Sequence, residues 1–284
     1  MITLSAKWVA EELLSLLSDQ EYKVHSVFDN GFNLQVGDVL CYIGNKYDMK
    51  LPYAIILEGA EIRKMSRIQN LPETNFSWDE QQKCFTSDES GRIMISVQAG
   101  MEYSSKLTSE HISDREKAVR EICSVIEPSH GVAVPTEELL QVLRSNCAED
   151  IRNVLKRVVG YGQGLTPSGD DFLMGILYTY QLLGIEVSHT FLDTLTDMVN
   201  HGYTTDTSVH YYRCAMRGMF SEPLLELAGA LVNPDGKMQL LHTVPSRERA
   251  RQSIEKLLTF GHTSGKDTAA GILAAARHVE NCLL

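Results

Sequence analysis

The stretch GLTPSGDDFLMGIL, residues 164–177, sets the organisation of this sequence. Its first eight residues are mostly Gly, Thr, Pro, Ser and Asp, and an apolar run follows at once, which is typical of a loop that leads into a helix. Residues 261–273, GHTSGKDTAAGIL, repeat the pattern. Without Pro167, the two stretches share G-x-T-S-G-x-D-x-x-x-G-I-L. The sequence therefore predicts two similar helix starts.

Helix capping explains part of this repeat. Ser168 with Asp171, and Ser264 with Asp267, have the i, i+3 spacing of a capping box in which Asp stands in place of Glu. Carboxylates in the first turn also suit the positive end of the helix dipole. Two well-capped helices would need nothing more than these four residues.

Four glycines indicate close backbone contacts that capping does not require. Gly169 and Gly265 stand at the first helical position, where glycine lowers helix stability unless something approaches the backbone closely. Gly175 and Gly271 each lie four residues after an Asp, on the same helix face one turn further in. We therefore expect the two helices to cross or run side by side through these glycines. Their N-termini would then build one site from two loops.

Helix starts of this kind bind small anions, because free N–H groups, hydroxyls and the positive dipole end point the same way. The carboxylates of Asp170, Asp171 and Asp267 would repel an anion unless an amide, a metal ion or Lys266 lay between them. Either the carboxylates cap the helices while backbone and hydroxyls hold an anion, or they bind a cation such as Mg²⁺. The predicted substrate-binding residues at the two starts are Thr166, Ser168, Gly169, Asp170, Thr263, Ser264, Gly265 and Lys266.

His262 lies inside the second repeat, beside these polar residues. A histidine at a helix start is either structural or an acid–base group that touches the ligand. The predicted catalytic residues are His262, Asp171 and Asp267.

A third polar helix start lies between the two repeats, in TTDTSVHYYRCAMRGMFSEPLL, residues 204–225. Thr205 and Ser208 belong to its run of hydroxyls and extend the predicted substrate-binding set. A basic face follows, formed by His210, Arg213 and Arg217 at helical spacing. This face is either a solvated stripe or the source of a counter-charge for an anionic substrate, and Arg213 is the residue we assign to that role.

The remaining pattern predicts an α+β protein with an N-terminal β-rich domain, barrel- or sandwich-like, at residues 1–127 and a mainly α-helical domain at 128–284. A leading helix is expected over residues 5–18. The expected strands lie at 22–28, 31–37, 39–44, 53–59, 75–79, 83–88 and 92–98, with a hairpin turn at 88–91. The expected helices lie at 113–127, 136–160 (one or two), 168–183, 189–201, 206–219, 222–232, 246–259 and 264–282.

The composition of the chain limits the kinds of molecule that it can bind and the compartment in which we expect it. The formal net charge of −11 argues against nucleic acid, which requires a basic surface. No stretch is apolar for long enough to predict a membrane span, and the N-terminal segment lacks the pattern of a signal peptide. The six cysteines show no C-x-x-C spacing, so we expect thiols in a reducing compartment and a cytoplasmic protein.

Three stretches, GQGLTPSGDDFLMGIL, TTDTSVHYYRCAMRGMFSEPLL and LLTFGHTSGKDTAAGIL, in this order resemble the AllH family over roughly residues 160–284. The named member of that family is the H subunit of the oxamate carbamoyltransferase of anaerobic allantoin breakdown. The resemblance implies that oxalurate and phosphate give oxamate and carbamoyl phosphate. It also implies a small anionic substrate (phosphate, carbamoyl phosphate or an oxamate-like molecule) and partner subunits, one FdrA-like and others of the carbamoyltransferase.

Two further functions stay open at this point: a non-catalytic scaffold or small-ligand-binding subunit, and a metal-dependent hydrolase built on Asp170, Asp171 and Asp267. A substrate-binding function predicts that the two S-G-x-D motifs lie within ~10 Å of each other and line a pocket. A scaffold function predicts that they lie apart, or that protein groups satisfy every buried polar atom.

Overall fold

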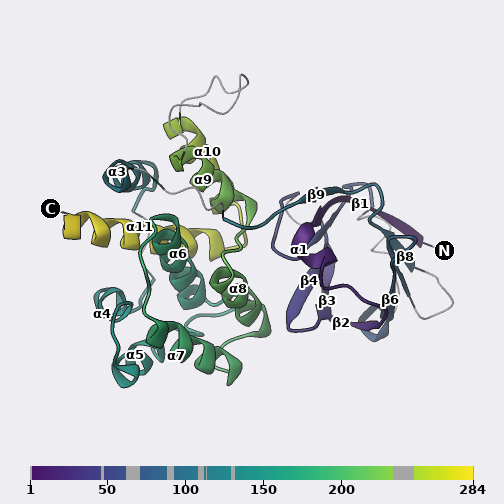
Figure 1. Ribbon diagram of the computed structural model, residues 1–284, viewed down its shortest axis with the longest axis horizontal. Helices are drawn as coiled ribbons and strands as arrows, with labels where there is room; N and C mark the ends of the chain where they lie inside the picture. Colours follow the sequence, from purple (N-terminus) through teal and green to yellow (C-terminus); the bar gives the residue numbers. More distant parts are fainter. Residues whose placement is uncertain are drawn as a thin grey trace. The chain divides into compact units, whose positions relative to one another are not determined.

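The computed structural model describes residues 2–45, 48–61, 71–87, 93–107, 112, 114–128, 132–232 and 246–283. The chain divides into two compact units, Met1–Lys106 and Leu107–Leu284. The first unit is built mainly of strands and the second of helices, as Figure 1 shows, and the predicted α+β class is confirmed.

The division falls earlier than the predicted boundary after residue 127. Helix α3, Arg115–Val125, lies within the range predicted for the N-terminal domain, but it packs in the helical unit. Its Val119 and Ile122 share a buried cluster with Ile272 and Ala276 near the C-terminus. Hydrophobic burial therefore assigns α3 to the second unit.

The first unit contains an eight-stranded barrel. Its strands follow the order β5-β4-β3-β2-β6-β7-β8-β1, and an antiparallel β1–β5 pairing closes the ring, while β9 pairs in parallel with β1. The strands are β1 Ile2–Ala10, β2 Glu21–Phe28, β3 Gly31–Val36, β4 Val39–Gly44, β5 Ile55–Leu57, β6 Asn75–Asp79, β7 Cys84–Ser87, β8 Ile93–Ser96 and β9 Met101–Tyr103. The predicted turn at residues 88–91 lies outside the described residues.

The predicted helix at residues 5–18 is wrong for its first half. Residues Ile2–Ala10 form strand β1, and helix α1 spans only Glu11–Leu14. Leu4 and Ala6 are buried on one side of the strand, which is the alternation of a strand rather than a helix. Pairing with β5, β8 and β9 outweighs the helical preference of this segment.

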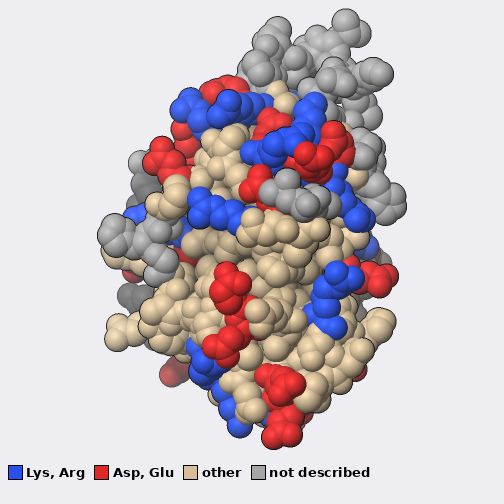
Figure 2. All heavy atoms as spheres, turned by 90° about the vertical axis from the view of Figure 1, so that its left-hand side faces the viewer, with Lys and Arg blue, Asp and Glu red and all other residues tan. Residues whose placement is uncertain are grey.

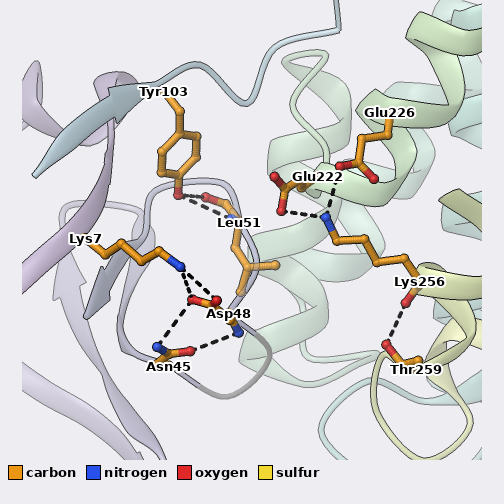
Figure 3. Close-up of polar contacts among 9 residues, drawn as sticks. All are labelled: Lys7, Asn45, Asp48, Leu51, Tyr103, Glu222, Glu226, Lys256 and Thr259. Carbon is orange, nitrogen blue, oxygen red and sulfur yellow. Dashed lines mark hydrogen bonds and ion pairs between the residues drawn. The ribbon is translucent and has the colours of Figure 1, made fainter. Parts of the chain in front are cut away.

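Side-chain bonds tie the barrel's connections to its strands (Figure 3). The ammonium group of Lys7 on β1 pairs with the Asp48 carboxylate at 2.8 Å. The Asp48 N–H donates to the Asn45 side chain at 2.9 Å, which holds the turn in place. The hydroxyl of Tyr103, at the end of β9, donates to the carbonyl oxygen of Leu51 at 2.6 Å.

The helical unit follows the sequence pattern closely. After α3 come α4 Thr136–Val142, α5 Ala148–Leu155, α6 Ser168–Leu182, α7 His189–Asn200, α8 Asp206–Met216, α9 Glu222–Val232, α10 Ser246–Leu258 and α11 Ser264–Leu283. The predicted segment 136–160 is thus two helices. Asp114 caps α3 by accepting from the Lys117 N–H at 2.9 Å, whereas the other cap candidate, Ser113, lies outside the described residues.

Helices α6 and α11 form the centre of this unit. One buried cluster joins them to α3, α9 and α10, and a second joins them to α4, α5, α7 and α8. Tyr178 of α6 lies in the first cluster, whereas Phe172 and Ile176 lie in the second. The starts of α6 and α11 are therefore fixed by helices packed on both sides.

Charged groups surround this centre. Lys256 on α10 lies 3.0 Å from both Glu222 and Glu226 on α9 (Figure 3). Figure 2 shows acidic and basic side chains interspersed on one face of the helical unit. Within the described ranges, no helix combines the length and apolarity needed to cross a membrane.

Candidate functional site

Helices α6 and α11 cross through a pair of glycines. A Cβ atom at Gly175 would lie 2.1 Å from the carbonyl oxygen of Thr268 on α11. A Cβ atom at Gly271 would lie 2.0 Å from the carbonyl oxygen of Phe172 on α6. These distances leave no room for any side chain. The crossing predicted from the glycine spacing is confirmed.

The first-turn glycines also pack against backbone, but the approaching group belongs to the chain itself. A Cβ at Gly169 would lie 2.0 Å from the carbonyl oxygen of Val158, just after α5. A Cβ at Gly265 would lie 1.9 Å from the carbonyl oxygen of Leu257, in α10. The close approach was correctly predicted. Its cause is helix packing, so both glycines have a structural role here.

The two starts repeat each other in backbone bonding. The Gly169 N–H donates to the Tyr161 carbonyl at 2.8 Å, and the Gly265 N–H donates to the Phe260 carbonyl at 2.9 Å. Together with the reciprocal glycine contacts, this indicates an approximate local twofold relation between the starts of α6 and α11. Asp171 and Asp267 occupy equivalent positions in that relation.

Hydroxyl groups join the two motifs directly. The Oγ1 atom of Thr166 lies 2.7 Å from the Oγ atom of Ser264, although 98 positions separate them in sequence. The motifs therefore meet well within the distance predicted for a shared site.

Asp171 lies beside this hydroxyl pair and has an unusual pKa. Burial raises the pKa of its carboxyl to about 7, although the nearby hydroxyls of Ser264 and Thr166 lower it. The neighbouring charges of Asp267 and Asp170 raise it further. Asp171 can therefore gain and lose a proton near neutral pH, as general acid–base catalysis requires.

Asp171 does not cap its helix. The N-cap residue of α6 is Pro167, which provides no side-chain cap, and Ser168 is the first helical residue. The capping-box interpretation is therefore wrong at α6. The N–H groups of Asp170 and Asp171 donate to the Pro167 carbonyl at 2.9 and 3.1 Å.

These bonds limit anion binding at the start of α6. The N–H groups of Gly169, Asp170 and Asp171 all donate to carbonyl oxygens of the chain, and in α11 the Asp267 N–H donates to Thr263. An anion at a helix N-terminus depends on free N–H groups. A ligand at these helix starts would therefore have to bind to side chains, because these backbone N–H groups are already bonded within the chain.

Asp170 has a different environment from Asp171. It is only 3% exposed, and its Oδ1 accepts from the Gly160 N–H and the Tyr212 hydroxyl, each at 2.9 Å. Its Oδ2 accepts from the hydroxyl of Thr204. Both oxygens of Asp170 are thus bound by protein donors that attach α8 to α6.

The start of α8 joins the other two. Thr205 caps α8 by accepting from the Ser208 N–H at 3.1 Å, and its own hydroxyl donates to the Leu165 carbonyl. Ser208 is 2% exposed and lies one helical turn before Tyr212, on the same face. That face meets α6, because Tyr212 binds Asp170.

Three buried side-chain oxygens in the described part of the chain have no hydrogen-bond partner. They are Asp171 Oδ2, Asp267 Oδ2 and Ser208 Oγ. Each belongs to one of the three helix starts, α6, α11 and α8. Buried polar atoms are nearly always hydrogen-bonded in folded proteins, so these three oxygens are the candidate atoms for bonds to a ligand.

Other predicted residues lie elsewhere or at the surface. Arg213 donates to the Asn200 side chain at 2.8 Å, at the end of α7. His210 is buried, with its Nε2 3.5 Å from the Cys214 sulfur, so it does not belong to an exposed stripe. Three residues at the start of α11 are exposed: His262, Thr263 and Lys266.

Tyr212 and Thr204 were not predicted as site residues. Both bind the Asp170 carboxylate. The sequence could have indicated both residues, because Tyr212 follows Ser208 at helical spacing and Thr204 is the first of the hydroxyl residues at the start of α8. Burial then raises the Tyr212 pKa, together with the Asp170 charge, so this phenol stays protonated as a donor.

No group of three or more His, Cys, Asp or Glu side chains in the described ranges is arranged to hold a metal ion. In the set proposed for Mg²⁺ or for a metal-dependent hydrolase, both Asp170 oxygens already accept from protein donors.

These features define an α+β protein whose helical unit brings three polar helix starts together. Residues 158–276 match the family described as oxamate carbamoyltransferase subunit AllH. That range contains all three starts, and the resemblance inferred from the three motifs is confirmed over it. No solved structure matches the chain.

Proposed function

We propose that this chain is the substrate-binding subunit of a carbamoyltransferase-type enzyme of purine and allantoin breakdown, acting on oxalurate, oxamate and carbamoyl phosphate. The substrate binds where the starts of α6, α8 and α11 converge. The observation that carries the proposal is the 2.7 Å contact between Thr166 and Ser264. It joins both copies of the repeat inside the region that matches an oxamate carbamoyltransferase subunit.

The chemistry of carbamoyl transfer suits Asp171. Phosphate forms a bond to the carbamoyl carbon of oxalurate, and the bond from that carbon to the amide nitrogen of oxamate breaks. The departing nitrogen must receive a proton. A carboxyl with a pKa of about 7 is protonated often enough at neutral pH to supply it.

The other residues have separate roles in this proposal. The hydroxyls of Thr166 and Ser264 bond to the Asp171 carboxyl and hold it in position. Asp170 positions α8 against α6. Lys266, exposed in the first turn of α11, offers the positive charge for phosphate. FdrA-like and other carbamoyltransferase subunits complete the enzyme.

Isothermal calorimetry with oxamate, phosphate and carbamoyl phosphate tests the proposal. We expect the full chain to bind at least one of them, and Thr166→Val and Ser264→Ala to weaken that binding at least tenfold. Ser124→Ala, which removes an exposed hydroxyl on α3, serves as the matched control and should bind like the wild type. Folded wild-type protein that binds none of the three would favour the scaffold function instead.

A further inference from the structure

We infer that the site selects ligands with a primary amide or carbamoyl NH₂ group, and that Asp171 and Asp267 make this selection. The inference rests on the proposed function, because it assigns the part of the substrate that meets the converging helix starts. It goes further by naming the group recognised and the two residues that discriminate.

The two unpartnered carboxylate oxygens require donors. The Oδ2 atoms of Asp171 and Asp267 are buried without any hydrogen-bond partner. An ionised carboxylate can only accept hydrogen bonds, and a buried acceptor without a donor is costly. An NH₂ group offers two N–H donors on one nitrogen. The local twofold relation supplies one Asp oxygen from each repeat, which suits such a pair of donors.

Ser208 provides an independent indication. Its hydroxyl oxygen is unpartnered, and the residue is 2% exposed. Residues on either side of it contact the start of α6: Thr205 donates to Leu165, and Tyr212 donates to Asp170. Ser208 therefore lies on the face of α8 that is directed at this start. A hydroxyl can donate to a carbonyl oxygen, so acceptors for NH₂ and a donor for C=O occur together.

An anionic group is a poor occupant of the same place. The N–H groups of Gly169, Asp170 and Asp171 are already bonded within the chain. A carboxylate or phosphate oxygen would bring only acceptors to two further carboxylates. Sites built to bond a substrate N–H can reject analogues that lack it by factors on the order of 10⁴, because the buried partners are left unpaired.

Three ligands of equal size test the selection. Oxamate, oxalate and pyruvate have the same heavy-atom skeleton and differ at one position, which is NH₂, O⁻ or CH₃. Calorimetric titrations of the full chain at pH 8 give their dissociation constants. We expect oxamate to bind wild-type protein at least tenfold more tightly than either analogue.

Two isosteric variants assign the selection to residues. Asp171→Asn and Asp267→Asn each place an N–H donor where a carboxylate oxygen stood. Each should reduce the preference for oxamate over oxalate at least tenfold. Asp193→Asn, an equal charge change on an exposed residue of α7, is the control and should leave the preference unchanged.

The outcomes separate the two claims. Equal binding of all three ligands, or a preference that both Asp variants retain, would overturn the selection while leaving the binding site in place. If folded wild-type protein bound none of them, the proposed function would fail together with the inference. Circular dichroism of each variant shows that it is folded.

Discussion

At the residue scale, the two adjacent aspartates of one motif have opposite environments. Asp170 accepts bonds from Gly160, Thr204 and Tyr212, whereas Asp171 has a buried oxygen with no partner. The sequence distinguishes the two carboxylates only through the repeat, which pairs Asp171 with Asp267, and it does not show which donors surround each of them. Their difference arises from α8, which supplies donors to one side of the turn only. The structure thus gives Asp170 a positioning role, and Asp171 is the carboxyl to which we assign the proposed chemistry.

Asp171 makes stability depend on pH. Its pKa rises from 3.8 to about 7 on folding, so between these values the folded state keeps a proton that the unfolded chain has lost. The free energy of unfolding therefore falls as pH rises through this window, and stays level above it. Asp171→Asn should remove this dependence and stabilise the protein above pH 7 by up to roughly 4 kcal/mol. Urea unfolding at pH 5 and pH 8 measures it; identical pH profiles for variant and wild type would contradict the pKa assignment.

Asp170 should matter for folding rather than for acid–base chemistry. Asp170→Ala leaves the Gly160 N–H and the Tyr212 hydroxyl without their acceptor. We expect a loss of about 2–4 kcal/mol in unfolding free energy, since each buried donor left without an acceptor costs about 1–3 kcal/mol. Tyr212→Phe, which removes one donor, should cost less. Chemical denaturation of both variants provides the comparison, and a neutral Asp170→Ala would refute the positioning role.

At the element scale, the repeat predicted the crossing of α6 and α11, because a glycine one turn inside each of two similar helices leaves space for the backbone of the other. The helix bounds were also predictable from apolar periodicity and polar starts. Strand β1 was not predictable, because its short apolar segment fits both helical and strand spacing. Its pairing with β5, β8 and β9 determines that it is a strand. The Tyr212–Asp170 bond was equally hidden, since nothing local indicates which helix a buried tyrosine faces.

A methyl group at the crossing should force the helices apart. Gly271→Ala puts a Cβ where only 2.0 Å separates it from the Phe172 carbonyl oxygen. We expect a loss of at least about 2 kcal/mol in unfolding free energy, together with weaker ligand binding. The control is Gly229→Ala on α9, where a Cβ meets nothing within 4 Å and should stabilise the helix by about 0.5–1 kcal/mol. Equal thermal stability of the two variants would argue against the crossing.

At the scale of the whole molecule, the candidate site belongs to one of the two units. All three helix starts lie in Leu107–Leu284, and so does the region that matches the AllH family. Composition and periodicity were enough to predict a β-rich unit followed by a helical one. The unit to which α3 belongs was not predictable, because an amphipathic helix of this kind could pack on either unit. Its burial against α11 shows that it belongs to the helical unit.

The helical unit should therefore fold and bind by itself. We expect residues 107–284 expressed alone to give a helical circular dichroism spectrum with cooperative unfolding, and to retain oxamate affinity within about threefold of the full chain. Calorimetry on both proteins checks this. A folded fragment without affinity would show that the barrel unit contributes to binding.

One small ligand should bind where the starts of α6, α8 and α11 converge. Backbone amide chemical shifts recorded by NMR during an oxamate titration measure this binding residue by residue. We predict that the amides of Thr166, Ser168–Asp171, Thr205–Ser208 and Ser264–Asp267 shift together and saturate with a single dissociation constant. Shifts confined to one of these starts, or located elsewhere in the chain, would contradict it.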